Sequence, residues 1–268
     1  MTTSAAPPAD VREATRRHLA ALDAAAPGLV ASLYLTGSAA LGDYQPGRSD
    51  IDFMGFTTRP VTEPDVVALL AGVHASLPRS ATKYDGSYVA QTALFGVPDD
   101  EPPAPHVVNG EFRGTEPNHA LTPATWTEFN RYGIAVRGPR AASLGIEIPR
   151  DRLSRWTLGN LNGYWRRRST EGLEHGRTLE TGAPVAGELV AWDALGAARL
   201  HYTLATGDIA SKSAAGRYAM DLFPAYTDVV SAALAWRATG DGEFTVADWC
   251  RCAQQTLDII ADANRRWG

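Results

Sequence analysis

Two aspartates separated by one residue are the side chains of this sequence best suited to hold a cation. Asp50 and Asp52 open a β-like run, so both carboxylates project from one face of the predicted strand. Neighbouring carboxylates repel each other unless a cation neutralises them. Oxygen ligands of this kind suit Mg²⁺, which proteins bind through one or two carboxylates together with substrate phosphates. The spacing therefore predicts a divalent-cation site.

A glycine–serine pair ends the β-like run that precedes these aspartates. Small residues that can begin a helix follow Gly37-Ser38, so the turn offers backbone N–H groups and a hydroxyl. Such groups bind phosphate oxygens. Together with the carboxylates at Asp50 and Asp52, the turn predicts a site for a Mg²⁺–nucleoside triphosphate.

The elements that must position these motifs form a predicted mixed α/β region. The two strands are expected over 30–36 and 51–57, joined by a segment that contains glycine and proline. Periodicity predicts helices and further strands around them. These elements are helices over 10–26, 63–77 and 122–132, strands over 83–94 and 134–136, and a proline-rich loop over 96–117.

The second half of the chain predicts helices alone. No convincing strand pattern follows Asp151. The expected helices cover 156–167, 185–206, 213–222, 224–238 and 246–267. The simplest organisation is an α/β domain over residues 1–148 followed by a helical domain over residues 149–268.

Composition is typical of a globular enzyme. The 268 residues are 44% hydrophobic and 21% charged, and no run approaches the roughly 18 apolar residues of a membrane span. The first residues lack the basic start and apolar core of a secretion signal. Cys250 and Cys252 are too few for a zinc site and badly spaced for a disulfide. These features predict a cytoplasmic protein without a membrane partner.

The net charge of −5 bears on the partner. A dedicated nucleic-acid-binding protein usually presents a basic face, which this charge argues against. A mildly acidic chain fits a cationic small substrate better.

Two separate blocks of sequence together resemble a known family. The segment 35–52, with its Gly-Ser pair, spacer and Asp-x-Asp, resembles the nucleotidyltransferase superfamily. The segment 198–212 is similar to part of the helical domain of streptomycin/spectinomycin-type aminoglycoside adenylyltransferases. The resemblance implies an α+β fold: an N-terminal polymerase-β-like nucleotidyltransferase domain, a mixed sheet with helices, followed by an all-α helical domain.

The resemblance also implies residue roles. Asp50 and Asp52 match the pair that holds two Mg²⁺ ions in the family, with ATP as co-substrate. Arg and Lys of the family's second block reach the triphosphate from the helical domain. The implied nucleotide-binding residues are Gly37, Ser38, Ser49, Arg199 and Lys212.

A third carboxylate is expected on a neighbouring strand, and Asp85 is the candidate. It follows the second strand by a helix-length interval, where the family carries a Glu. Asp is one methylene shorter, and Asp85-Gly86 is also a turn signal. General base, metal ligand and structural turn therefore remain as alternatives.

Fewer residues match the family at the positions that would contact the acceptor. Phe112 follows a Gly-Glu pair, as a family Trp does, and Trp192 lies where a polar pocket residue is expected. Glu188 and Asp193 are carboxylates that suit a cationic substrate. These residues, Phe112, Glu188, Trp192 and Asp193, are the predicted contacts of a small, cationic or polyhydroxylated acceptor.

The leading hypothesis is a Mg²⁺-dependent transfer of AMP from ATP to a hydroxyl of an aminoglycoside or aminocyclitol, with release of pyrophosphate. Asp85 would orient or deprotonate that hydroxyl. One alternative is nucleotidylation of a protein or RNA, against which the large helical domain speaks. The other is a nucleotide-binding relative without catalysis.

Overall fold

The structure is a computed structural model that describes residues 6–77, 84–94 and 102–268. The chain divides into two units, Met1–Ile148 and Pro149–Gly268. Each unit has its own apolar core. Among the described helices, none combines the length and the apolar character needed to cross a membrane.

A six-stranded mixed sheet lies at the centre of the first unit, in the order β5-β4-β3-β2-β1-β6. β2 pairs antiparallel with β1 on one side and parallel with β3 on the other. β4 and β5 form a hairpin beside β3, and β6 pairs with β1. The strands are β1 (Val30–Thr36), β2 (Ile51–Thr57), β3 (Tyr84–Ala90), β4 (His106–Val108), β5 (Glu111–Arg113) and β6 (Ile134–Arg137).

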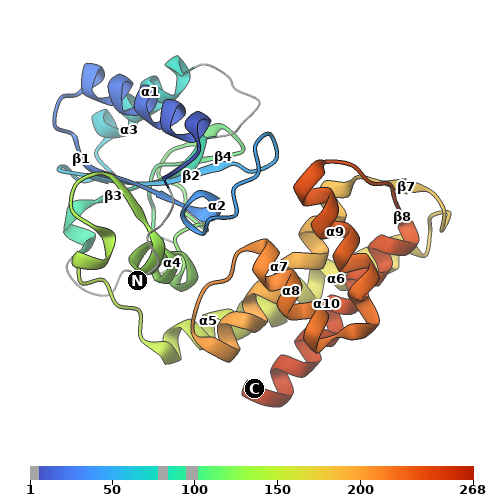
Figure 1. The fold of residues 1–268 in the computed structure, drawn as a ribbon. Helices are drawn as coiled ribbons and strands as arrows, with labels where there is room; N and C mark the ends of the chain where they lie inside the picture. Colours follow the sequence, from blue (N-terminus) through green and yellow to red (C-terminus); the bar gives the residue numbers. More distant parts are fainter. Residues whose placement is uncertain (1–5, 78–83, 95–101) are drawn as a thin grey trace. The chain divides into compact units, whose positions relative to one another are not determined.

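Helices cover both faces of this sheet (Figure 1). α1 (Ala9–Ala25) and α3 (Pro64–Ser76) lie on one face, where His18 and His74 contact the ring of Phe53. α4 (Pro123–Tyr132) lies on the other, where Trp126 contacts Phe56. The single turn α2 (Gly37–Ala40) follows β1 directly. Packing on both faces of the sheet thus fixes the end of β1 and the starts of β2 and β3, where the predicted site residues lie.

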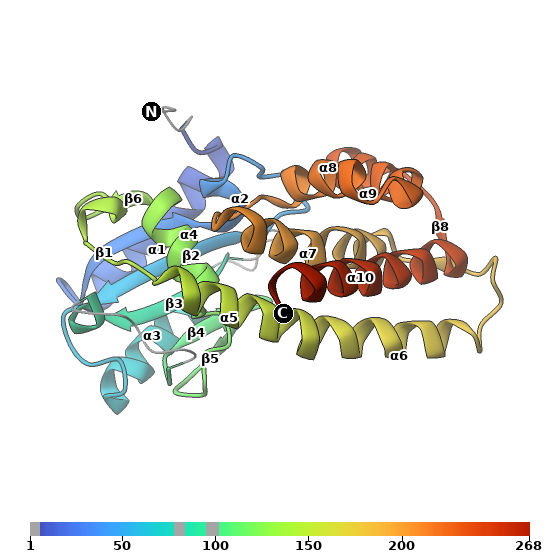
Figure 2. The ribbon, with the colours of Figure 1, turned by 90° about the horizontal axis from the view of Figure 1, so that it is seen from below.

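Helices build the second unit. α5 (Arg150–Asn160) continues through a π-helical turn, Leu161–Trp165, into α6 (Arg166–Gly176), and the three follow one another as one long helix (Figure 2). The remaining helices are α7 (Gly187–Thr206), α8 (Lys212–Leu222), α9 (Thr227–Thr239) and α10 (Val246–Trp267). The strands of the described unit are β7 (Pro184–Val185) and β8 (Phe244–Thr245), which pair with each other.

The predicted fold class is confirmed, and several details of the expected elements are wrong. The loop expected over 96–117 contains the β4–β5 hairpin, whose turn residues Asn109 and Gly110 have φ of 55° and 74°. Asn-Gly is a strong hairpin signal, but its flanking strands are too short to show alternation. The helix expected over 156–167 begins at Arg150, and the second unit, expected to be all-α, also contains the short β7–β8 pair. The strand expected over 83–94 ends at Ala90, and Gln91–Leu94 form a 3₁₀ helix. Its expected start, Lys83, and residues 95–101 lie outside the described residues.

A buried cluster of two histidines and a tyrosine ties α1 and α3 to the sheet. The Nε2 atoms of His18 and His74 lie 2.6 and 2.7 Å from the hydroxyl of Tyr88. Burial lowers the pKa of His74 to about 4 and lowers the pKa of His18 well below its usual value. Both rings are therefore neutral in the native protein near pH 7.

This cluster predicts a loss of stability in acid. Histidines in the unfolded chain have a pKa near 6.5, whereas the native cluster stays neutral at that pH. Below about pH 6.5 the unfolded chain therefore binds more protons than the native protein. The folded pKa values are lowered, so stability falls as the pH drops from about 6.5 toward 4. The linkage relation gives a loss of about 2 kcal/mol at pH 5 for His74 alone. Urea unfolding at pH 7.5 and pH 5 measures this change.

The matched variants are His74→Gln and, on an exposed residue of the same unit, His119→Gln. The first should flatten the dependence of the unfolding free energy on pH, and the second should leave it as in the parent protein. Equal pH dependence in both variants would show that the buried cluster is not the cause.

Candidate functional site

Three adjacent strands bring Asp52 and Asp85 together. In the register of the sheet, Asp52 of β2 pairs with Thr36 of β1 on one side and with Asp85 of β3 on the other. Paired residues on neighbouring strands project from the same face. Asp50, two positions before Asp52, is exposed just ahead of β2. The sheet therefore places Asp85 beside the Asp-x-Asp pair.

The Gly37-Ser38 turn lies against this group. Gly37 has a φ of 60°, and a Cβ added there would lie 1.9 Å from Oδ2 of Asp52. Only glycine allows this approach, both for its backbone angle and for the space. The hydroxyl of Ser38 is buried and has no hydrogen-bond partner. Because buried polar groups are normally satisfied, this hydroxyl is suited to bind a ligand oxygen or water.

Ser49 closes the loop that leads into β2. Its hydroxyl accepts the N–H of Gln45 at 3.0 Å, and its own N–H donates to the Gln45 carbonyl at 2.8 Å. The residue is buried, with 7% of its surface exposed. These bonds fix the backbone immediately before Asp50.

The carboxylate of Asp85 holds the β4–β5 hairpin. It accepts the N–H groups of Asn109 and Gly110 at 2.7 and 2.8 Å. Asp85-Gly86 lies inside β3 and not at a chain reversal, so the turn alternative for Asp85 is wrong. The residue instead anchors the turn of a separate hairpin.

Phe112 lies on the second strand of that hairpin. Its ring stacks on His74, with centroids 5.8 Å apart and planes 29° apart, and it packs against the core of the unit. The side chain is half-buried. Asp85 and Phe112 are thus connected through one hairpin.

The donor set of the first unit suits Mg²⁺ bound together with phosphate. Among the residues that the structure describes, no group of three or more His, Cys, Asp or Glu side chains is arranged to hold a metal ion. Mg²⁺ in nucleotide sites takes one or two carboxylates and completes its shell with phosphate oxygens and water. Asp50 and Asp52 fit an ion of that kind.

A fourth carboxylate, not predicted from the sequence, lies at this place. Glu128 of α4 is buried, with 7% of its surface exposed, and accepts the N–H of Gly37. The only local signal is an acidic residue next to the buried Phe129 on a short amphipathic helix. Its partner is 91 positions away along the chain, so sequence spacing does not reveal the pair.

In the second unit, Arg199 and Lys212 lie close to one corner between α7 and α8. Nε of Arg199 donates to the carbonyl of Ala210 at 3.0 Å, two residues before Lys212 opens α8. The Nζ atom of Lys212 lies 5.0 Å from the ring centroid of Trp192. The structure therefore joins a predicted nucleotide residue to a predicted acceptor residue.

Trp192 is exposed, and its ring packs against a second tryptophan. It is 43% exposed and stacks on Trp165, with centroids 6.1 Å and planes 24° apart. Gly196 lets Trp165 lie against α7, since a Cβ there would meet the indole at 1.9 Å. Glu188 is exposed one helical turn before Trp192, on the same face of α7.

The side chain of Asp193 is buried, unlike that of its neighbour Trp192. It is 6% exposed, and its carboxylate accepts Nε of Arg168 at 2.5 Å and Nε1 of Trp249 at 2.7 Å. The side chain thus joins α6, α7 and α10. Of the two predicted acidic contacts, Glu188 is exposed and Asp193 is enclosed.

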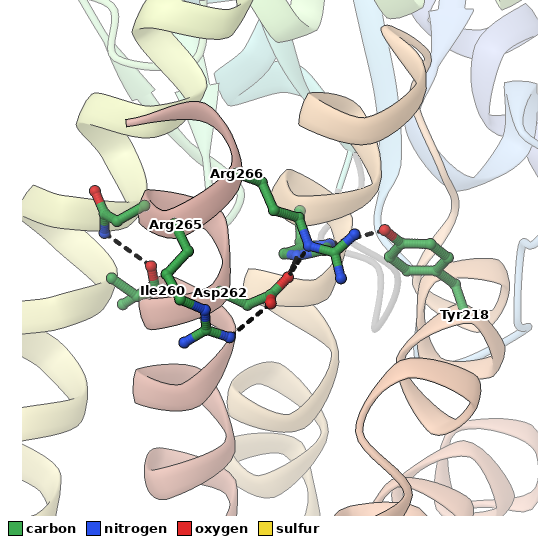
Figure 3. Close-up of polar contacts among 7 residues, drawn as sticks. Tyr218, Ile260, Asp262, Arg265 and Arg266 are labelled. Atoms are coloured by element: carbon green, nitrogen blue, oxygen red, sulfur yellow. Dashed lines mark hydrogen bonds and ion pairs between the residues drawn. The ribbon is translucent and has the colours of Figure 1, made fainter.

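A network around His201 holds α7 and α8 against α10. Its Nδ1 lies 2.8 Å from the hydroxyl of Tyr218, and its Nε2 lies 2.9 Å from Oδ2 of Asp262. Figure 3 shows Asp262 bonded to both Arg265 and Arg266. Burial lowers the pKa of His201 although Asp262 opposes this, so the neutral ring donates to Asp262 and accepts from Tyr218. The network fixes the helices that carry Arg199 and Lys212.

Comparison with known proteins agrees with this geometry. Residues 16–96 match the family model described as a nucleotidyltransferase domain. The crystal structure of spectinomycin adenyltransferase AAD(9) from Enterococcus faecialis with ATP and spectinomycin has a similar fold, with a TM-score of 0.66 at 15% identity. The match covers 93% of this chain and 99% of that chain. No curated protein gives a significant sequence match.

Residues 16–96 of the first unit therefore match a nucleotidyltransferase domain, which supports an enzyme of this kind. In its fold it is similar to the aminoglycoside adenylyltransferases, with a polymerase-β-like domain followed by a helical one.

Proposed function

We propose that this chain transfers AMP from ATP to a hydroxyl of an aminoglycoside or aminocyclitol, in a Mg²⁺-dependent reaction that releases pyrophosphate. The observation that carries the proposal is the contact of Gly37 with the Asp52 carboxylate beside Asp85. A phosphate-binding turn and carboxylates suited to Mg²⁺ meet there. The structural relative bound to ATP and spectinomycin supports the choice of substrates.

In the proposed reaction, Asp50 and Asp52 would hold the two Mg²⁺ ions, which would offset charge on the nucleotide phosphates. Bound ions of this kind offset phosphate charge and stabilise both the attacking and the leaving oxygen. The Ser38 hydroxyl donates to a phosphate oxygen. Asp85 takes the proton of the acceptor hydroxyl, whose oxygen attacks the α-phosphorus in line while the bond to pyrophosphate breaks.

The helical unit carries two cations that we assign to the nucleotide. Arg199 and Lys212 would bind the triphosphate and offset charge on the departing pyrophosphate. Phe112, Glu188 and Trp192 would contact the acceptor. Asp193 would act indirectly, because its carboxylate is bonded to Arg168 and Trp249.

Lys212→Ala is expected to raise the KM for ATP about 10- to 100-fold, the usual value of a charged hydrogen bond. The KM for the acceptor should change much less, because the partner of the ammonium is a phosphate. Initial rates at varied ATP and at varied acceptor measure both constants. Arg217→Ala, which removes an exposed cation from the same helix, is the matched control. Unchanged ATP affinity with lost acceptor binding would contradict the assignment.

A labelled-transfer screen tests the proposed function. ATP and GTP labelled at the α-phosphate are incubated with aminoglycosides, aminocyclitols, lincosamides and nucleoside antibiotics, with tRNA and bulk protein as further acceptors. Label on an aminocyclitol or aminoglycoside supports the proposal. Label on RNA or protein favours nucleotidylation of a macromolecule. Nucleotide binding without any transfer favours a nucleotide-binding protein without catalysis.

A further inference from the structure

Glu128 is a buried carboxylate for which the proposed chemistry has no role. Its Oε1 atom accepts the N–H of Gly37 at 2.5 Å, and the residue is 7% exposed. Burying a carboxylate costs free energy unless strong hydrogen bonds compensate. A bond from a backbone N–H to an ionised oxygen is among the stronger ones in proteins. The pairing is therefore a defined feature of the site and not a surface contact.

The helix that carries Glu128 has little freedom to move. Trp126 and Phe129 lie on either side of Glu128 in the sequence of this helix, and both are fully buried. The ring of Phe129 meets the ring of Tyr34 of β1 at a centroid distance of 5.0 Å and nearly at right angles. Thr122 caps the start of the helix by accepting the N–H of Thr125. The carboxylate is thus held at a fixed place relative to β1.

Gly37, the partner of this carboxylate, is the residue at which β1 turns into α2. Its φ of 60° lies in the left-handed region, which glycine adopts without a steric cost. The approach of Gly37 to Oδ2 of Asp52 leaves no room for a Cβ. A rotation of the Gly37 peptide would therefore move the Ser38 hydroxyl and displace Asp52 together.

The contact of Glu128 with the Gly37 turn is to a main-chain group. The Oε1 atom of Glu128 is bonded to the backbone N–H of Gly37. Glu128 acts on the site through the backbone of Gly37.

We propose that Glu128 is a positioning residue that fixes the Gly37 peptide and thereby holds Ser38 and Asp52 in the arrangement that receives the nucleotide. It does so as a hydrogen-bond acceptor, so a neutral acceptor of the same shape should keep part of its effect. The catalytic consequence rests on the proposed function, whereas the bond to Gly37 does not.

Three variants separate bond, charge and packing. Glu128→Gln keeps an acceptor oxygen without the charge, and Glu128→Leu removes the acceptor at similar volume. Thr127→Val is the control: Thr127 is also buried in α4, but its hydroxyl bonds to the carbonyl of Pro123 within the helix. The first readout is amide hydrogen exchange and the amide resonance of Gly37, measured without nucleotide. The second is the set of steady-state constants with ATP, Mg²⁺ and acceptor.

Glu128→Leu should speed exchange at Gly37 and lower kcat about 10- to 100-fold, the loss expected from a small misplacement of reacting groups. It should also raise the Mg²⁺ concentration needed for half-maximal rate, while the KM for the acceptor stays near that of the parent. Glu128→Gln should be impaired less than Glu128→Leu, because it keeps an acceptor oxygen whose bond is weaker without the charge. Thr127→Val should resemble the parent in all of these measurements.

Unchanged exchange at Gly37 and an unchanged kcat in Glu128→Leu would overturn the inference. A Gln variant as impaired as the Leu variant would also overturn it, because charge and not the bond would then matter. If the Leu variant does not fold, Glu128→Asp, which withdraws the oxygen by one methylene, takes its place with the same expected outcome. Absence of transfer in the parent protein would refute the proposed function, while the exchange measurement would still decide the bond.

Discussion

Asp52→Asn is expected to abolish nucleotidyl transfer, with a loss in kcat of roughly 10²–10³-fold or more, as when a group that stabilises transition-state charge is removed. The substitution removes one negative charge with almost no change in volume. Since Gly37 packs directly on this side chain, an isosteric residue keeps the turn in place. The fold should therefore remain, and single-turnover transfer at saturating Mg²⁺ measures the loss.

Asp65→Asn is the matched control for this variant. Asp65 lies in the same unit, is exposed and pairs with Arg59 at the surface. It should transfer nucleotide at the parent rate. Near-parental turnover by Asp52→Asn at saturating Mg²⁺ would show that the carboxylate does not hold a catalytic cation.

The second large effect is expected at Asp85. If Asp85 takes the proton of the acceptor hydroxyl, Asp85→Asn should slow the chemical step by roughly 10²–10⁴-fold, the usual value of positioned proton transfer. Nucleotide binding should survive, because Asp50 and Asp52 remain. If Asp85 is instead a metal ligand, the affinity for Mg²⁺ should fall together with the rate.

The bonds from Asn109 and Gly110 add a third outcome for Asp85→Asn. An amide has one acceptor oxygen, so its NH₂ group would face one of the two N–H donors. If anchoring the hairpin is the whole role, thermal stability should fall and the rate per folded molecule should stay. Single-turnover rates against Mg²⁺ concentration, with the melting temperature, separate the three outcomes.

Glu111→Gln is the control for this experiment. Glu111 is an exposed carboxylate on the same hairpin, paired with Arg113 at 2.8 Å. It should leave the rate unchanged. A parental rate in Asp85→Asn together with a large loss in Glu111→Gln would indicate that Glu111, and not Asp85, takes the proton.

The elements predicted best from the sequence are those with strong local signals. β1 and β2 have the predicted bounds, because one apolar run ends at Gly37-Ser38 and the other begins at Asp50-x-Asp52. α10 also has its predicted bounds, and a capping box of Thr245 and Asp248 marks its start. The hairpin over 106–113 was missed, because strands of three residues carry too few alternating positions.

Most of the site geometry depends on contacts between distant segments. The pairing of Asp85 with Asp52 requires the parallel register of β3, and the bond from Gly37 to Glu128 requires the packing of α4. The enclosure of Asp193 by Arg168 likewise depends on helix packing in the second unit. Residue spacing indicates which side chains have the right chemistry, whereas the tertiary fold decides which of them meet.

The most direct test of the account compares ATP labelled at the α-phosphate with ATP labelled at the γ-phosphate, in the presence of Mg²⁺ and an acceptor found by the screen. We expect the α-label to become bound to the acceptor while the γ-label leaves in pyrophosphate, and we expect neither result with Asp52→Asn. Transfer of the γ-label to the acceptor, or release of the γ-label as inorganic phosphate without labelled acceptor, would contradict it.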